Sequence, residues 1–167
     1  MWPFRRRDPE SPEEKFKAGT RALEAQQFAQ AIELLSELCE AEPDNASAAV
    51  NLGTAYYQTG EYVAAARQFE RAAKLNPKSP KALVNLAAAR NALDRVDDAI
   101  EALLGALEID PQHPDCHYNL AIAYAKQGRL PEAMAELEME LALNRQHKPA
   151  QQLAERLRAQ YDLSPDE

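Results

Sequence analysis

The strongest constraint on the fold of this chain is an internal repeat of 34 residues. Small residues recur in this phase at two positions, Gly19, Gly53, Ala87 and Ala121 at the first and Ala31, Ala65, Ala99 and Ala133 at the second. Large apolar residues keep the same spacing at Leu35, Phe69, Leu103 and Leu137. No insertion or deletion interrupts the phase. A unit this short cannot bury an apolar face alone, so the pattern predicts an array of stacked, near-identical units.

The phase divides most of the chain into four units, 12–45, 46–79, 80–113 and 114–147. Each unit contains two stretches of about 14 residues with the 3.6-residue period of an amphipathic helix. In the second unit we expect these helices at Ala46–Thr59 and Tyr62–Leu75. Pro77 follows the second helix and ends it, because the residue before proline disfavours the α conformation. Pro43 and Pro111 hold the same slot in two other units.

Start signals precede the first helix of several units. Ser11, followed three residues later by Glu14, is typical of a capping box. Pro80 and Pro114 begin later units, where proline is tolerated because that N–H has no helical partner. We expect His113 to act as an N-cap substitute before Pro114.

The turn between the two helices of a unit has its own signal. Gly60 and Gly128 stand where the first helix must stop, and they suit a left-handed C-cap. Gln26 and Asp94 occupy the same slot in the other units. We therefore expect left-handed backbone at all four positions, at a higher cost for the two non-glycine residues.

These features together resemble the tetratricopeptide repeat (TPR) family. In the second unit the resemblance rests on Leu52, Gly53, Tyr56, Ala65, Phe69, Ala72 and Pro77. It implies an all-α fold, an α–α superhelix of four helix–turn–helix repeats over residues 12–147. Residues 148–161 are expected to form a C-terminal capping helix that solvates the end of the array. Residues 1–11 are expected to be a leader and 162–167 an acidic tail.

The resemblance implies that the first helix of each repeat lines a concave, peptide-binding groove. One row of that groove would be a ladder of side-chain amides at Asn51, Asn85 and Asn119, similar to the asparagine ladders of superhelical TPR arms. An amide can donate to and accept from a peptide backbone whatever the peptide sequence. The alternative, that asparagine is simply common at this slot in TPRs, stays open.

Other side chains would complete the groove. The expected apolar and polar contacts are Phe16, Val50, Thr54, Tyr57, Val84, Tyr118 and Ile122. Lys81 is one of two residues, with Asn51, that match the carboxylate clamp of chaperone-binding TPRs. Phe16, Thr20 and Asn85 depart from that clamp, which leaves too few cations to hold a carboxylate pair.

Charge and composition narrow the function classes. The net charge is −8 and the pI near 5.0, so the chain repels a phosphate backbone and we expect no nucleic-acid partner. No apolar run is long enough to span a membrane. Cys39 and Cys116 do not make a disulfide framework, and we expect reduced thiols and a cytoplasmic location.

Catalysis and metal binding have no sequence support. No phosphate-binding loop, nucleophile elbow or His-Glu-x-x-His motif occurs. His113, Asp115, Cys116 and His117 lie close in sequence, but their spacing matches no zinc signature. We therefore expect no enzyme activity, no metal and no cofactor.

Two functional hypotheses remain. The first is a protein–protein interaction scaffold that binds an extended or helical peptide of a partner in the groove and supports complex assembly. The second is a membrane-proximal assembly factor, in which the aromatic and basic residues from Trp2 to Arg7 add a surface contact. We expect membrane contact to be the weaker alternative, and homo-oligomerisation stays open.

Overall fold

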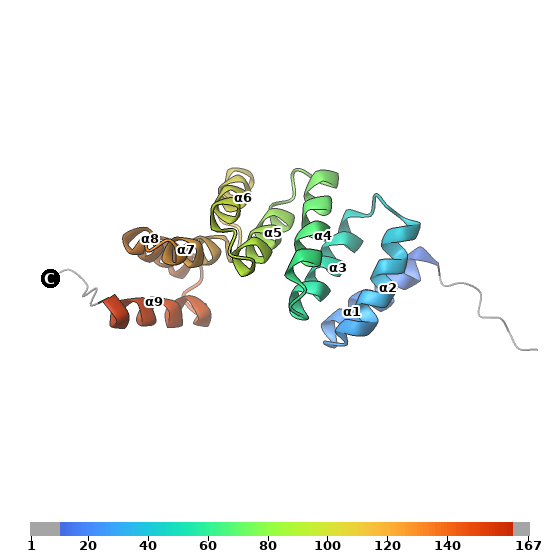
Figure 1. The fold of residues 1–167 in the computed structure, drawn as a ribbon, viewed down its shortest axis with the longest axis horizontal. Helices are drawn as coiled ribbons and strands as arrows, with labels where there is room; N and C mark the ends of the chain where they lie inside the picture. The colour runs from blue at the N-terminus through green and yellow to red at the C-terminus, as the bar shows by residue number, and fades with distance from the viewer. Residues whose placement is uncertain (1–10, 162–167) are drawn as a thin grey trace, which may run out of the picture. The chain divides into compact units, whose positions relative to one another are not determined.

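The structure is a computed structural model that describes residues 11–161, and within that range it contains only α-helices and the turns between them (Figure 1). The helices are α1 (Pro12–Glu24), α2 (Phe28–Ala41), α3 (Ala46–Gln58), α4 (Tyr62–Leu75), α5 (Pro80–Ala92), α6 (Val96–Ile109), α7 (Cys116–Lys126), α8 (Leu130–Leu143) and α9 (Lys148–Tyr161). The all-α expectation is confirmed. The chain divides into two compact units, unit 1 ending at Pro77 and unit 2 beginning at Lys78.

Unit 1 consists of the helical pairs α1–α2 and α3–α4. Its core contains Leu35, Leu38 and Leu52, of which the first two are fully buried. The two pairs also contain the small residues of the repeat at their close contacts. A Cβ added at Gly53 would lie 2.7 Å from Cε1 of Phe69, so α3 and α4 approach as closely as they do only because this residue has no side chain.

Arg71 ties the second pair of unit 1 to the first. Its Nε donates to the carbonyl of Pro43 at 3.1 Å, and its Nη2 donates to the carbonyl of Cys39 at 3.1 Å. These carbonyls lie at and just beyond the C-terminal end of α2, where helical carbonyls lack partners. A cation there also complements the helix dipole.

Unit 2 contains the pairs α5–α6 and α7–α8, closed by α9. One core cluster surrounds Leu103 and Leu120, and a second combines Leu137 with Leu153 and Leu157 of α9. The opposite side of α9 is exposed. The helix thus covers the apolar side of α7–α8 and turns its polar side to solvent, as a terminal element of a repeat array must.

The helix starts agree with the sequence except at α7. Ser11 Oγ accepts from the Glu14 N–H at 3.2 Å, and Glu14 Oε2 accepts from the Ser11 N–H at 2.9 Å, so the capping box is confirmed. The prediction that Pro114 begins the next helix is wrong, as is the N-cap role of His113. The α7 helix begins at Cys116 because Asp115 has φ +63°, which a right-handed helix cannot include.

Left-handed backbone is confirmed at all four turn positions inside the helical pairs. Gly60 has φ +81° and Gly128 has φ +72°, whereas the non-glycine residues Gln26 and Asp94 have φ +58° and +61°. A side chain in this region clashes with its own backbone. The turns at Gln26 and Asp94 are therefore strained in a way that the glycine turns are not.

Two further expectations concern the ends of the chain. The leader and the acidic tail fall largely on residues 1–10 and 162–167, outside the described residues. Among the described helices, none combines the length and the apolar character that crossing a membrane requires.

Candidate functional site

We call the first helix of each repeat, which the TPR resemblance predicts to line the groove, an inner helix. In unit 1 the inner helices α1 and α3 bring together several residues of the expected groove. Asn51 Nδ2 donates to Thr20 Oγ1 at 3.0 Å, which links the two helices through polar side chains. Phe16 lies one helical turn before Thr20 on α1, and Val50 directly precedes Asn51 on α3; both are half-buried, and Phe16 packs against the core of unit 1. The result is a surface with amide, hydroxyl and apolar groups side by side.

A cleft of about 350 Å³ opens at one end of this surface. Its lining residues come from α1, α2, α3 and the turn between α1 and α2, and they are Leu23, Glu24, Gln26, Phe28, Thr54 and Gln58. Sequence reasoning named only Thr54. A signal was available, because Phe28 belongs to a large-apolar position of the repeat, together with Tyr62, Val96 and Leu130.

In unit 2 the inner helices are α5 and α7, which hold the other two asparagines of the ladder. Asn85 is half-buried and makes no side-chain hydrogen bond to the described residues. Asn119 is also half-buried. Its side-chain Nδ2 donates to the backbone carbonyl of Asp115 at 2.8 Å, and its backbone carbonyl accepts from Asn91 Nδ2 at 3.2 Å. The Asn119 side chain therefore uses one amide hydrogen on the residue that directly precedes its helix.

Not every expected contact residue offers surface. Val84 is only 5 % exposed and belongs to the core cluster around Leu103, so it has little area to give a guest peptide. Tyr118 and Ile122 pack against the core that α9 completes and are half-buried. Lys81 is exposed in the first turn of α5, and Tyr57 of α3 stacks edge-on against Tyr62 at 5.2 Å.

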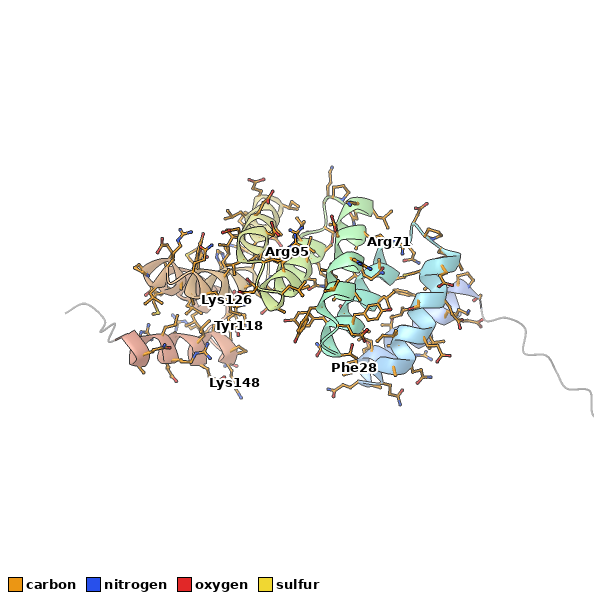
Figure 2. The ribbon with its side chains drawn as sticks, in the orientation of Figure 1. Phe28, Arg71, Arg95, Tyr118, Lys126 and Lys148 are labelled. Carbon is orange, nitrogen blue, oxygen red and sulfur yellow. The ribbon has the colours of Figure 1, made fainter. Side chains whose placement is uncertain are left out.

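Lys126 occupies the place in unit 2 that corresponds to the cleft of unit 1. Two repeat lengths separate Leu23, Gln26 and Gln58 from Asn91, Asp94 and Lys126. The Lys126 ammonium donates to the Asn91 carbonyl and lies 3.2 Å from Oδ1 of Asp94. Figure 2 labels Lys126 in unit 2 and Phe28 in unit 1. In unit 2 the Lys126 side chain thus links the residues that correspond to Leu23 and Gln26, whereas in unit 1 Gln58 makes no such bridge.

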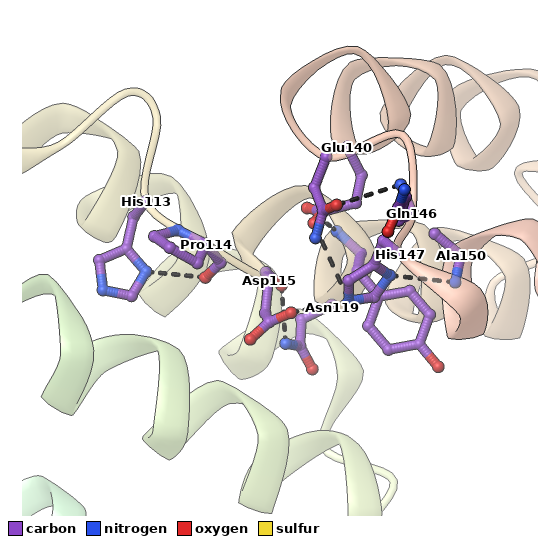
Figure 3. Close-up of polar contacts among 10 residues, drawn as sticks. His113, Pro114, Asp115, Asn119, Glu140, Gln146, His147 and Ala150 are labelled. Atoms are coloured by element: carbon purple, nitrogen blue, oxygen red, sulfur yellow. Dashed lines mark hydrogen bonds and ion pairs between the residues drawn. The ribbon is translucent and has the colours of Figure 1, made fainter.

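A polar cluster joins α7, α8 and α9 (Figure 3). His147 Nε2 lies 2.8 Å from Oδ1 of Asp115 and 3.9 Å from Oε1 of the buried Glu140. On its other side, His147 Nδ1 accepts from the Ala150 N–H at 3.1 Å, so the imidazole caps the N-terminus of α9. The Tyr118 ring packs on the His147 ring, with centroids 4.9 Å apart.

The same cluster contains atoms that could in principle ligate a metal. One ligand atom each from Asp115, Glu140 and His147 lies within 4.8 Å of the others. However, the backbone N–H of Ala150 requires a lone pair on Nδ1, so the proton of the neutral ring sits on Nε2 and points at Asp115. A metal ligand needs a lone pair on that nitrogen. The arrangement therefore suits a hydrogen-bonded helix cap better than a metal centre.

The four residues clustered in sequence from His113 to His117 do not converge. His113 Nδ1 contacts the Pro114 carbonyl at 2.9 Å, and His117 Nδ1 contacts Glu136 Oε2 at 2.7 Å. Cys116 is fully buried and its Sγ donates to the Leu103 carbonyl. Burial raises the pKa of the Cys116 thiol to about 12, with a further upward contribution from nearby carboxylates. A thiol with this pKa is not a nucleophile at neutral pH.

One family model described as tetratricopeptide repeat matches the chain twice, at residues 16–80 and 54–114, and a second model of the same description matches residues 94–161. The chain belongs to the tetratricopeptide repeat family, and its fold is that family's all-α solenoid. No curated protein sequence gives a significant match.

Solved structures of TPR proteins share this fold. A crystal structure of MamA aligns with a TM-score of 0.76 and 23 % identity, covering 87 % of this chain and 85 % of MamA. The structure of YrrB, a TPR protein with an unusual peptide-binding site, aligns with a TM-score of 0.77 and 20 % identity over 87 % of this chain and 75 % of YrrB. The first TPR of Spaghetti (RPAP3), bound to the HSP90 peptide SRMEEVD, aligns with a TM-score of 0.68 and 21 % identity over 72 % of this chain and 96 % of that domain.

Proposed function

We propose that this chain is a non-catalytic protein–protein interaction scaffold that binds an extended or helical peptide of a partner protein and supports complex assembly. The observation that carries the proposal is one repeat position on the inner helices α3, α5 and α7. That position is asparagine each time, at Asn51, Asn85 and Asn119, and each asparagine is half-buried.

The hydrogen bonds within the chain leave these amides able to bind a peptide backbone. Asn51 and Asn119 each donate one amide hydrogen internally, which orients the side chain and leaves its carbonyl oxygen to accept from a guest N–H. Asn85 has both its donor and its acceptor to offer. Such contacts recognise a backbone, while neighbours such as Val50 and Thr54 add side-chain contacts.

Two further observations support this function over catalysis. The buried thiol of Cys116 is held protonated, and the histidines His117 and His147 make hydrogen bonds that serve packing and capping. Among structurally similar proteins, YrrB is described by its peptide-binding site and the RPAP3 domain was solved with a peptide. A peptide-binding role for this chain is consistent with both.

The proposal is tested by quantitative affinity capture with mass spectrometry, followed by measured affinities for the partner recovered. The triple variant Asn51→Ala, Asn85→Ala and Asn119→Ala should bind that partner more weakly, by about 0.5–1.5 kcal/mol for each lost neutral hydrogen bond, and not additively. Asn85→Ala is the cleanest single change, because this side chain has no hydrogen bond to lose within the described chain.

The matched control is Asn76→Ala, at an exposed asparagine after α4 that lies outside the inner helices. It should leave the affinity unchanged. Circular dichroism must show the same helicity for every variant. Undiminished affinity in the folded triple variant would refute the asparagine ladder as the peptide contact.

The membrane-proximal alternative rests on the composition of residues 2–7, which combine two aromatic and three arginine side chains. Trp2 is the sole tryptophan, so its emission reports on this segment alone. A blue shift on adding anionic vesicles that vanishes when residues 2–7 are deleted would favour this alternative. An unchanged spectrum would remove it.

A further inference from the structure

The cleft of unit 1 has a chemical character that the asparagine ladder does not explain. Two of its six lining residues, Leu23 and Phe28, are apolar and half-buried. Three more, Gln26, Thr54 and Gln58, are neutral and polar. The sixth, Glu24, is an exposed carboxylate, and no lysine or arginine lines the cleft.

The volume suits one large side chain. About 350 Å³ lies at the lower end of the range for ligand pockets. An aromatic or long aliphatic group could fill it against Leu23 and Phe28. The carboxylate of Glu24 at its edge then favours a positive charge next to that group in the guest sequence.

The charge of the whole unit acts in the same direction. Unit 1, residues 1–77, carries nine lysine or arginine and twelve aspartate or glutamate side chains, a net charge of −3. A cationic peptide would therefore be attracted before contact, and an acidic one repelled.

From these observations we propose that the unit 1 cleft selects partner segments in which an aromatic or long aliphatic residue is flanked by arginine or lysine. This inference rests on the proposed peptide-binding function and adds the chemistry of the partner. It predicts that the cleft prefers basic peptides to acidic peptides such as SRMEEVD.

Unit 2 provides the matched comparison within the same chain. Two repeat lengths further on, Thr54 and Gln58 correspond to Ile122 and Lys126. Lys126 bridges the Asn91 carbonyl and Asp94 there. Transplanting both residues into unit 1, as Thr54→Ile with Gln58→Lys, should occupy the cleft and place a cation beside Glu24.

The test is selection of random twelve-residue peptides against the full chain, with affinities then measured by fluorescence anisotropy. Wild-type protein should enrich peptides with an apolar residue next to arginine or lysine. Glu24→Lys should weaken those peptides by about tenfold, since a favourable pair becomes a like-charge pair. The transplanted double variant should lose the enrichment.

Glu33→Lys is the control, because it makes the same charge change at an exposed position of α2 outside the cleft. It should keep the enrichment. If Glu24→Lys fails to fold, as judged by circular dichroism, Glu24→Gln replaces it and should weaken binding by a smaller factor in the same direction.

Different failures separate this inference from the function on which it rests. Enrichment of acidic or uncharged peptides, still sensitive to Asn85→Ala, overturns the charge preference and leaves the scaffold function standing. No peptide enrichment at all overturns both.

Residues 2–7 of the chain have the proposed composition themselves. Concentration-dependent self-association abolished by Arg5→Gln, Arg6→Gln and Arg7→Gln together would make a second copy the occupant and overturn the partner assignment.

Discussion

The close approach of α3 and α4 at Gly53 gives a sharp prediction for stability. In a helix interior, glycine to alanine is normally stabilising by about 1 kcal/mol. At Gly53 the new methyl carbon would lie 2.7 Å from Cε1 and 2.8 Å from Cδ1 of Phe69, whereas carbon atoms pack at about 3.5–4.0 Å. The ring must therefore move by roughly an ångström inside a closely packed interior, where it is only 2 % exposed.

Overpacking of this kind costs about 1–3 kcal/mol. Set against the helix-propensity gain, Gly53→Ala should destabilise unit 1 by up to about 2 kcal/mol. Gly105→Ala is the matched control, because Gly105 lies inside α6 and its added methyl would meet only Leu83 Cδ1, at an ordinary 3.8 Å. That change should stabilise unit 2 by up to about 1 kcal/mol.

Urea unfolding followed by circular dichroism at 222 nm measures both variants. The two free energies of unfolding should differ by about 1–3 kcal/mol, with Gly105→Ala the more stable. For a chain of this size, each kcal/mol corresponds to a shift of about 2–4 °C in melting temperature. If Gly53→Ala proves as stable as Gly105→Ala, the small residues of the repeat are not set by helix crossing and the packing argument fails.

Three further predictions concern single side chains. His147→Ala should lower stability by about 1 kcal/mol through loss of the α9 cap, whereas His147→Asn should retain most of it; equal melting temperatures for the two would contradict the capping role. Gln26→Gly should raise stability by up to about 1 kcal/mol by relieving left-handed strain, and a lower unfolding midpoint would show that its side chain matters more than its backbone. Burial raises the pKa of the Cys116 thiol from 9.0 to about 12, so the folded state favours the neutral thiol. The contribution of this thiol to the free energy of unfolding is therefore complete below pH 9 and declines as the pH rises toward 12. Cys116→Ala should show a smaller alkaline loss of stability, and rapid iodoacetamide labelling of native Cys116 at pH 8 would refute the burial.

Local signals in the sequence were sufficient to predict most helices. The second repeat shows this most clearly, since Ala46–Thr59 and Tyr62–Leu75 were expected and α3 and α4 span Ala46–Gln58 and Tyr62–Leu75. Repeat phase also identified Gln26 and Asp94 as left-handed positions. Such features depend on residues a few positions apart in the chain, and the 34-residue phase supplies several independent copies of each.

The errors arise where structure depends on contacts distant in sequence. Pro114 has the sequence signature of a helix start, but Asp115 adopts left-handed backbone and its carboxylate meets His147 of the next turn. Repeat phase placed Val84 on an exposed row, yet it packs into the core around Leu103. Phase assigns each residue to a face of its helix, and the burial of that face depends on which neighbours are large.

The same difference between local and long-range features applies to the candidate site. The asparagine positions could be read from the sequence because they repeat. The cleft of unit 1 could not be predicted from the sequence, because it is open only where no side chain bridges it. That Gln58 makes no bridge becomes apparent only in comparison with Lys126, which does so in unit 2. Its peptide-binding role remains a prediction.

The central claim is that a guest peptide binds to the inner helices of the repeats. Backbone amide chemical-shift mapping of the full chain, titrated with a selected peptide, tests it most directly. We predict that the largest shifts fall on α1, α3, α5 and α7, around Thr20, Asn51, Asn85 and Asn119. Shifts concentrated on the exposed apolar residues of α6 and α8, such as Leu104 and Met139, would contradict the account.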